Sequence, residues 1–174
     1  MCKYISILFI ALFMFSLNLK SQPHEYSSKV IQAGYLITKY GQGAQADLSI
    51  ITKNGNMNRY SIAFNTGEID KSTTKYNVIK ADYKYLYTLV SKKPVYLNLG
   101  GGGFLSCELT SNDILDRHKN KFSPGLSAIL EFELFISNIG LFVSGEQLYR
   151  PASIIGKLEY RIDLGLKYVF RYEF

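Results

Sequence analysis

The sequence predicts an all-β fold: an antiparallel, up-and-down transmembrane β-barrel of about eight strands that follows a cleaved N-terminal signal peptide. Apolar and polar residues alternate with a period of two along most of the chain. Beyond the first apolar run, no stretch of about 18 apolar residues could form a membrane helix. The 174 residues are 47% hydrophobic and 20% charged, which indicates one compact domain and excludes a disordered tail.

The first apolar run, residues 4–19, follows the lone basic residue Lys3 and has the length of a signal-peptide core. We expect a signal peptide over residues 1–21 and a barrel over residues 22–174. A helical membrane anchor is the alternative, but sixteen residues rise only about 24 Å as a helix, and no polar soluble domain follows. A lipoprotein is disfavoured because Cys2 precedes the apolar run.

Removal of residues 1–21 leaves 18 basic and 14 acidic side chains, a net charge of +4. These charges are interspersed along the chain and form no basic stripe, so we expect no direct contact with nucleic acid. The mild basic excess favours a negatively charged membrane surface. Cys107 becomes the single cysteine of the mature chain and indicates no disulfide framework.

The alternation is clearest in the last segment, where a soluble sheet and a membrane strand are both compatible with it. The aromatic residues gather towards its end, as expected at a membrane interface, and favour the membrane strand. Its apolar positions are Leu158, Tyr160, Ile162, Leu164, Leu166, Tyr168, Phe170, Tyr172 and Phe174.

Seven earlier segments alternate in the same way: residues 31–37, 44–50, 60–64, 79–89, 95–99, 126–136 and 139–143. With the last segment they make eight strands. The 153 mature residues then allow about 19 per strand and connection, which suits membrane strands of about 9–11 residues. No segment with helical periodicity could cover a sheet, so closure into a barrel is the way to remove its edges.

The predicted connections alternate between the two ends of the barrel. If both termini face the periplasm, the outward loops are residues 40–42, 68–75, 110–122 and 150–156. The inward turns are residues 53–58, 90–94 and 137–138. The longest connection then faces outward, as in outer-membrane barrels, although the first outward loop is short for this rule. Asn54 with Gly55 and Ser137 with Asn138 favour tight inward turns.

Charged residues occupy the positions between the apolar ones, which face the barrel lumen. The candidates for ion pairs in the lumen are Lys80, Asp82, Lys84, Glu131, Glu133, Glu146 and Arg161, and the same face carries Glu159, Asp163 and Lys167. An eight-stranded barrel is filled by side chains, so these mixed charges predict ion-paired plugs. Selective transport is the alternative.

The segment from Asp163 to Phe170 resembles the insertion signal of bacterial outer-membrane proteins: a polar residue, then a glycine, then two aromatic residues at fixed spacing. The residues that match this signal are Asp163, Gly165, Tyr168 and Phe170, with Phe174 at the end of the chain. We therefore expect the barrel-insertion machinery and outer-membrane lipid as partners, and the outer membrane of a Gram-negative bacterium as the location.

No pattern predicts catalysis, a cofactor or a metal site. Gly100–Gly103 follow a strand-like segment, but no capped helix and no Lys-Ser or Lys-Thr pair follows, so a nucleotide site is disfavoured. His24 and His118 lack the spacing partners of a metal site or a nucleophilic triad. We expect His118 to lie in a loop, and a membrane lipid hydrolase is disfavoured because no histidine lies on a predicted strand. We expect a protein that is not an enzyme.

From Tyr96 to Phe170 the sequence resembles the TraO family of conjugal transfer proteins from Bacteroidetes conjugative elements. An apolar strand enters a glycine-rich stretch (YLNLGGGGFLSCEL), and an alternating strand with two acids follows (LSAILEFELFIS). A strand ending in Gly-Glu-Gln and a final DLGLKYVF complete the likeness. The resemblance implies an outer-membrane component of a type IV secretion-like mating apparatus, with other conjugation proteins as partners and no catalytic residues.

Two alternatives stay open. The first is a general small barrel for adhesion or surface protection, with residues 110–122 as its contact surface. The second is a soluble periplasmic barrel that binds an apolar ligand, which would require the two faces of the strands to be reversed.

Overall fold

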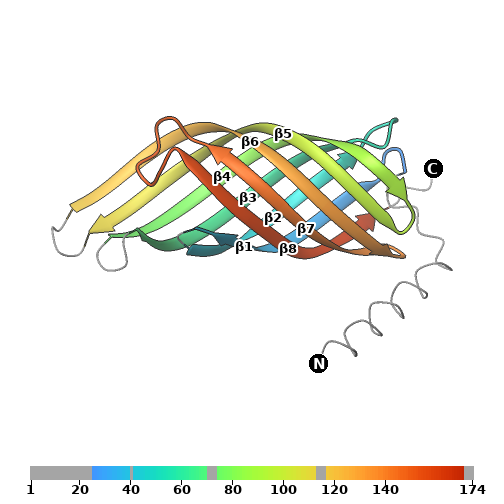
Figure 1. Ribbon diagram of the computed structural model, residues 1–174, viewed down its shortest axis with the longest axis horizontal. Helices are drawn as coiled ribbons and strands as arrows, with labels where there is room; N and C mark the ends of the chain where they lie inside the picture. Colours follow the sequence, from blue (N-terminus) through green and yellow to red (C-terminus); the bar gives the residue numbers. More distant parts are fainter. Residues whose placement is uncertain (1–24, 40, 70–73, 113–116, 171–174) are drawn as a thin grey trace, which may run out of the picture.

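The computed structural model describes residues 25–39, 41–69, 74–112 and 117–170. Eight antiparallel strands close into one barrel, in which each strand pairs with the next along the chain and the last pairs with the first (Figure 1). The predicted fold class is thereby confirmed. The strands are β1 (Lys29–Thr38), β2 (Gly41–Ile51), β3 (Met57–Ile69), β4 (Thr74–Lys92), β5 (Val95–Asn112), β6 (Arg117–Ile136), β7 (Ile139–Tyr149) and β8 (Leu158–Phe170).

The barrel closes between β1 and β8, with Lys29 opposite Phe170 and Ile37 opposite Ile162. Ten consecutive residue pairs without a register shift join these two strands. Closure leaves no free edge around the body of the barrel, which an isolated sheet of this length would expose. Among the described residues, no helix is long and apolar enough to cross a bilayer.

The polarity of the barrel is inverted relative to a soluble protein. Outward side chains are large, apolar and exposed, as at Ile62 (66%) and Leu166 (57%). Inward positions hold charged side chains without solvent exposure, as at Arg59 and Glu131 (both 0%). The faces lie as the alternation predicted, so the soluble barrel with an apolar interior is wrong. Lipid is the environment in which this exterior is stable.

Three strands are much longer than the others, which have 10 to 13 residues. β1, β2 and β7 have 10, 11 and 11 residues. At about 3.3 Å per residue and a tilt of about 40°, ten residues span about 25 Å, the height of the apolar band of outer-membrane barrels. β4, β5 and β6 have 19, 18 and 20 residues. The β5–β6 hairpin therefore projects beyond the body of the barrel at one end (Figure 1).

The projecting part corrects the predicted loop over residues 110–122. β5 continues to Asn112 and β6 resumes at Arg117, in unbroken register. The physical reason is that the outward face of a strand outside the bilayer meets water and needs no apolar residues, so the apolar alternation disappears and the polar residues resemble a loop. We call residues 104–112 of β5 and 117–125 of β6 the β5–β6 extension.

The opposite end of the barrel carries the short turns. They span residues 52–56, 93–94 and 137–138, next to the start of β1 and the end of β8. Gly55 and Ser137 have positive φ angles of 77° and 59°, the left-handed conformation that tight hairpin turns require. We call this the turn end. The longest connection joins β7 to β8, residues 150–157, at the end of the extension.

Candidate functional site

The lumen is the part of the molecule where polar groups converge, and an apolar cap closes it at the turn end. Tyr96 and Phe135 contact each other edge to face, with ring centroids 5.9 Å apart. The buried cluster around them consists of Val30, Ile51, Met57, Leu86, Tyr96, Ile129, Phe135 and Val169. Burial of these side chains excludes water from the lumen at this end.

Next to the cap lies a group of charged side chains centred on Glu131, which we call the Glu131 layer. Arg59 on β3 donates two hydrogen bonds to the carboxylate of Glu131 on β6, at 2.6 and 2.7 Å. Lys167 on β8 lies 2.7 Å from Glu131 and 2.5 Å from Glu133. Asn98 donates to Glu133 at 2.8 Å. The layer thus joins β3, β5, β6 and β8 across the lumen, and its bidentate pair is of the strong, directional kind.

Further along the lumen lies the Glu146 layer. Glu146 on β7 lies 2.5 Å from Arg161 and 3.1 Å from Lys84. Lys84 and Lys80 also pair with Asp82, at 3.0 and 2.5 Å. All five side chains are nearly inaccessible to solvent. Because each buried charge lies against one of opposite sign, the cost of removing these groups from water is compensated.

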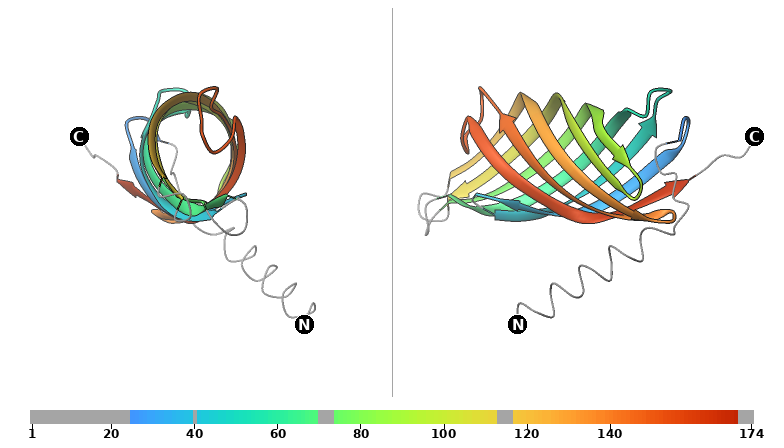
Figure 2. Two further views of the ribbon diagram at one scale, coloured as in Figure 1. Left: turned by 90° about the vertical axis from the view of Figure 1, so that its left-hand side faces the viewer. Right: turned by 45° about the vertical axis from the view of Figure 1, so that its right-hand side comes forward.

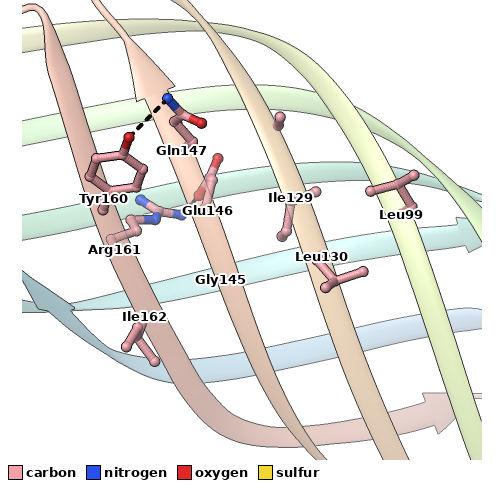
Figure 3. A pocket seen from close by; sticks show the side chains of 10 residues that line it. Leu99, Ile129, Leu130, Gly145, Glu146, Gln147, Tyr160, Arg161 and Ile162 are labelled. Carbon is pink, nitrogen blue, oxygen red and sulfur yellow. Dashed lines mark hydrogen bonds and ion pairs between the residues drawn. The ribbon is translucent and has the colours of Figure 1, made fainter.

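The walls of the barrel at the Glu146 layer show the alternation directly. Glu146 and Arg161 belong to the lumen, while the neighbouring residues Gln147 and Tyr160 are exposed on the outer wall (Figure 3). Gln147 donates to the hydroxyl of Tyr160 at 3.4 Å. The hollow of the outer wall beside them is lined mainly by aliphatic side chains, as expected for a lipid-facing surface.

The third group closes the mouth at the end of the extension. Buried Arg150 pairs with Glu159 and lies 3.5 Å from Glu108. The other oxygen of Glu108 accepts a hydrogen bond from the backbone N–H of Ile154 at 2.7 Å. The connection between β7 and β8 therefore folds over the opening of the barrel (Figure 2).

An apolar contact holds the same connection in place. Ile155 is 8% exposed and packs in one cluster with Tyr76 and Val78, which face inward from β4. The space between this mouth and the Glu146 layer, next to Lys80 and Arg161, has a volume of about 10 Å³, which is about one water molecule. Side chains of the apolar cap, the two charged layers and the mouth thus occupy successive levels of the described lumen.

All seven sequence-predicted lumen residues are buried. The structure brings five of them together in the Glu146 layer: Lys80, Asp82, Lys84, Glu146 and Arg161. The other two, Glu131 and Glu133, share Lys167 in the Glu131 layer. Asp163 lies 3.3 Å from Arg161, and Glu159 pairs with Arg150.

Sequence reasoning missed several lumen residues. Arg59 and Asp47 lie at inward positions of β3 and β2, so the same alternation could have identified them. Glu108 fell just before a predicted loop, and Arg150 fell within another. Their contact depends on how the connection folds back, for which the sequence carries no local signal.

The predicted insertion signal has a defined geometry. Asp163 faces the lumen and is buried, whereas Tyr168 and Phe170 face outward with ring centroids 4.7 Å apart. A Cβ atom at Gly165 would overlap the backbone of Ala33 on β1, so glycine is required there. Phe174 and residues 1–21, the predicted signal peptide, lie outside the described residues. Recognition by the insertion machinery stays a prediction.

Among the described residues, no group of three His, Cys, Asp or Glu side chains could hold a metal ion. Gly100–Gly103 lie in the middle of β5 rather than before a helix. Cys107 is half-buried and has no disulfide partner in the described part of the chain. His24 lies outside that part, and His118 lies in β6, opposite Ser111, so its predicted loop position is wrong.

No family model matches the sequence, and no curated protein matches it either. Solved structures do resemble it. The N-terminal β-barrel domain of Pseudomonas aeruginosa OprF is 12% identical with a TM-score of 0.62, and the match covers 83% of this chain and 98% of that one. Neisserial surface protein A is 13% identical with a TM-score of 0.64, covering 82% and 96%. Ail of Yersinia pestis, the attachment invasion locus protein, is 14% identical with a TM-score of 0.61, covering 84% and 100%.

These likenesses extend over almost the whole of each solved barrel, and at such low identity they concern the fold. Together with the apolar exterior and the charged lumen, they define the class of the molecule. It is a small, eight-stranded β-barrel of the outer membrane of Gram-negative bacteria. None of the three comparison structures bears a name that refers to conjugation.

Proposed function

We propose that this protein is a non-enzymatic outer-membrane anchor that displays the β5–β6 extension outside the cell as a contact surface, as a small adhesion or surface-protection barrel does. One observation carries the proposal: paired charges occupy the lumen, while β6, together with its partner β5, runs nine residues, about 30 Å of strand, past the end of β7. A filled barrel suits an anchor better than a diffusion pore.

The orientation is part of the proposal. Outer-membrane barrels have short periplasmic turns and longer extracellular connections. Here the turns over residues 93–94 and 137–138 share an end with the start of β1 and the end of β8. The extension and the connection over residues 150–157 lie at the other end. We therefore place the extension outside, and the predicted signal peptide and insertion segment would deliver the chain accordingly.

Cysteine labelling on intact cells tests this display. In a Cys107→Ser background, the substitutions Lys121→Cys in the extension and Lys53→Cys in the turn end each supply one thiol. A membrane-impermeant maleimide should label Lys121→Cys on intact cells, and Lys53→Cys only after the outer membrane is opened. Labelling of Lys53→Cys alone on intact cells would reverse the orientation and contradict the proposal.

A role in conjugation is the second candidate, and the sequence from Tyr96 to Phe170 supports it through its resemblance to the TraO family. In this case the contact surface would bind other proteins of the mating apparatus. Conjugation genes should then flank this one, and the tagged barrel should co-purify with mating-channel proteins from donor cells. Deletion should lower transfer frequency; unchanged transfer and a chromosomal setting without conjugation genes would favour the general surface barrel.

A further inference from the structure

One segment of β6 pairs on a single side. Residues 117–125 pair with β5, but β6 begins to pair with β7 only at Leu126, opposite Tyr149. Within the described ranges, no other strand or turn forms a backbone pair with residues 117–125. A strand edge of this length is a template on which a further strand can be added.

Pro124 indicates which backbone groups point to the open side. In an antiparallel pair, alternate residues direct both their N–H and C=O groups to the same neighbour. Ser106 donates a side-chain hydrogen bond to the carbonyl of Ser123 at 2.9 Å, so the Ser123 carbonyl faces β5. Pro124, which has no N–H, then lies at a position that faces away from β5, where a strand tolerates proline.

The same alternation defines the whole edge. Residues 118, 120, 122 and 124 direct their backbone groups to the open side and offer three N–H groups and four carbonyls. This number of groups suits an added strand of about seven residues. The edge is thus a backbone binding site of defined length.

The charges along the edge select the partner. Arg117, Lys119 and Lys121 occupy alternate positions, and Lys121 is exposed. Glu108 lies opposite Lys121 in the register, but it is buried and already engaged by Arg150 and by the N–H of Ile154. Basic residues therefore recur at every second position of the edge, and among the described side chains the carboxylate opposite Lys121 is already engaged elsewhere.

A second copy of this chain fits the edge poorly. If two such edges paired antiparallel, even-numbered residues would lie opposite even-numbered ones, because these are the residues that face the open side. Lys119 and Lys121 would then lie opposite each other or opposite themselves, and like charges in such pairs are destabilising. A strand with carboxylates at every second position has the complementary pattern.

The intervening positions favour apolar groups in that partner. Phe122 is 77% exposed on the other face of the segment. We propose that residues 117–125 bind an extended, acidic segment of a partner protein as an additional strand, with carboxylates at the register positions of the basic residues and apolar side chains beside Phe122. This rests on the proposed function, which places the edge outside the cell.

Peptide binding tests the proposal on the full barrel folded in detergent micelles. The probe is a fluorescent seven-residue peptide that alternates Glu and Val, and its control alternates Lys and Val. Fluorescence anisotropy should show the Glu peptide binding about tenfold more tightly than the Lys peptide, since two or three cross-strand ion pairs distinguish them. The double variant Lys119→Glu with Lys121→Glu should reverse this preference.

Two further variants separate strand addition from general charge attraction. Asn120→Pro removes an N–H that faces the open side and leaves pairing with β5 intact, as Pro124 does, so it should abolish binding of the Glu peptide. Lys75→Glu makes one Lys-to-Glu change on β4, away from the edge, and should leave the preference unchanged. A heat-dependent shift in gel mobility confirms that each variant is folded.

The proposal is overturned if the two peptides bind equally, if the charge reversal does not reverse the preference, or if Asn120→Pro binds as the unchanged protein does. A further outcome is that a sulfated oligosaccharide displaces the Glu peptide and binds Asn120→Pro as tightly as the unchanged protein. That result would identify a site for polyanions and overturn strand addition. Micelles impose no inside or outside, so this result is independent of the labelling experiment on cells.

Discussion

At the scale of single residues, the neighbouring strand leaves no room for a side chain larger than that of Gly102. A Cβ atom at this inward position of β5 would overlap the carbonyl oxygen of Tyr83 on β4, whereas a Cβ atom at Gly145 would meet nothing within 4 Å. We expect Gly102→Ala to lower the free energy of unfolding by roughly 1–3 kcal/mol, and Gly145→Ala to leave it nearly unchanged. Urea unfolding in micelles, followed by circular dichroism, measures both; equal effects would contradict this packing.

Glu131 is the carboxylate on which its layer depends, because Arg59 and Lys167 both pair with it. We expect Glu131→Ala to destabilise the barrel by about 3–5 kcal/mol, since it leaves the buried charge of Arg59 without its main partner. The double variant Arg59→Met with Glu131→Leu should recover part of this loss, because an apolar pair replaces an ionic one. The same unfolding measurement gives both values, and a double variant less stable than the single one would refute the pairing argument.

At the scale of strands, substitutions at one position inside the apolar band and one outside it distinguish the body of β6 from its extension. Leu130 faces outward from the body and is 50% exposed, and Phe122 faces outward from the extension and is 77% exposed. Leu130→Lys should lower the free energy of unfolding in lipid bilayers by about 2–4 kcal/mol, because its charge enters hydrocarbon. Phe122→Lys should leave that free energy nearly unchanged, because its charge stays in water. Folding titrations in lipid vesicles measure the free energy of unfolding of both variants. Equal costs would mean that the extension lies in the membrane.

The strands could be predicted where lipid faces one side of the chain and the lumen faces the other. β8 and the body of β6 alternate along most of their length, apart from the inward apolar residues Ile129, Phe135 and Val169, and that pattern predicts both strands. The sequence predicts a loop over residues 110–122 because, outside the bilayer, the outward face needs no apolar residues and the alternation is lost. Local sequence therefore locates the strands best within the bilayer.

The candidate site was predictable to a similar degree. Alternation placed Glu131 and Glu146 in the lumen, and it would also have placed Arg59 there. It could not pair them, because partners such as Arg59 and Glu131 lie 72 positions apart and meet only through the stagger of the closed barrel. The contact of Arg150 with Glu108 additionally requires the connection over residues 150–157 to fold over the mouth.

At the scale of the whole molecule, the filled lumen predicts that the barrel does not conduct ions. The apolar cap, the Glu131 layer, the Glu146 layer and the mouth obstruct the lumen in series. The purified protein in planar bilayers should therefore give no stepwise currents under an applied voltage, in contrast to a porin measured in the same cell. Regular unit currents from the unchanged protein would contradict a filled lumen.

Gel mobility after fractionation tests whether this chain is a closed membrane barrel with its charges inside. The full chain is expressed with its N-terminal segment in a Gram-negative host, and the outer-membrane fraction is compared with and without heating. We expect a band in this fraction whose mobility changes on heating, because a closed barrel resists detergent until it is heated. A protein found in the soluble periplasmic fraction, with one mobility under both conditions, would contradict it.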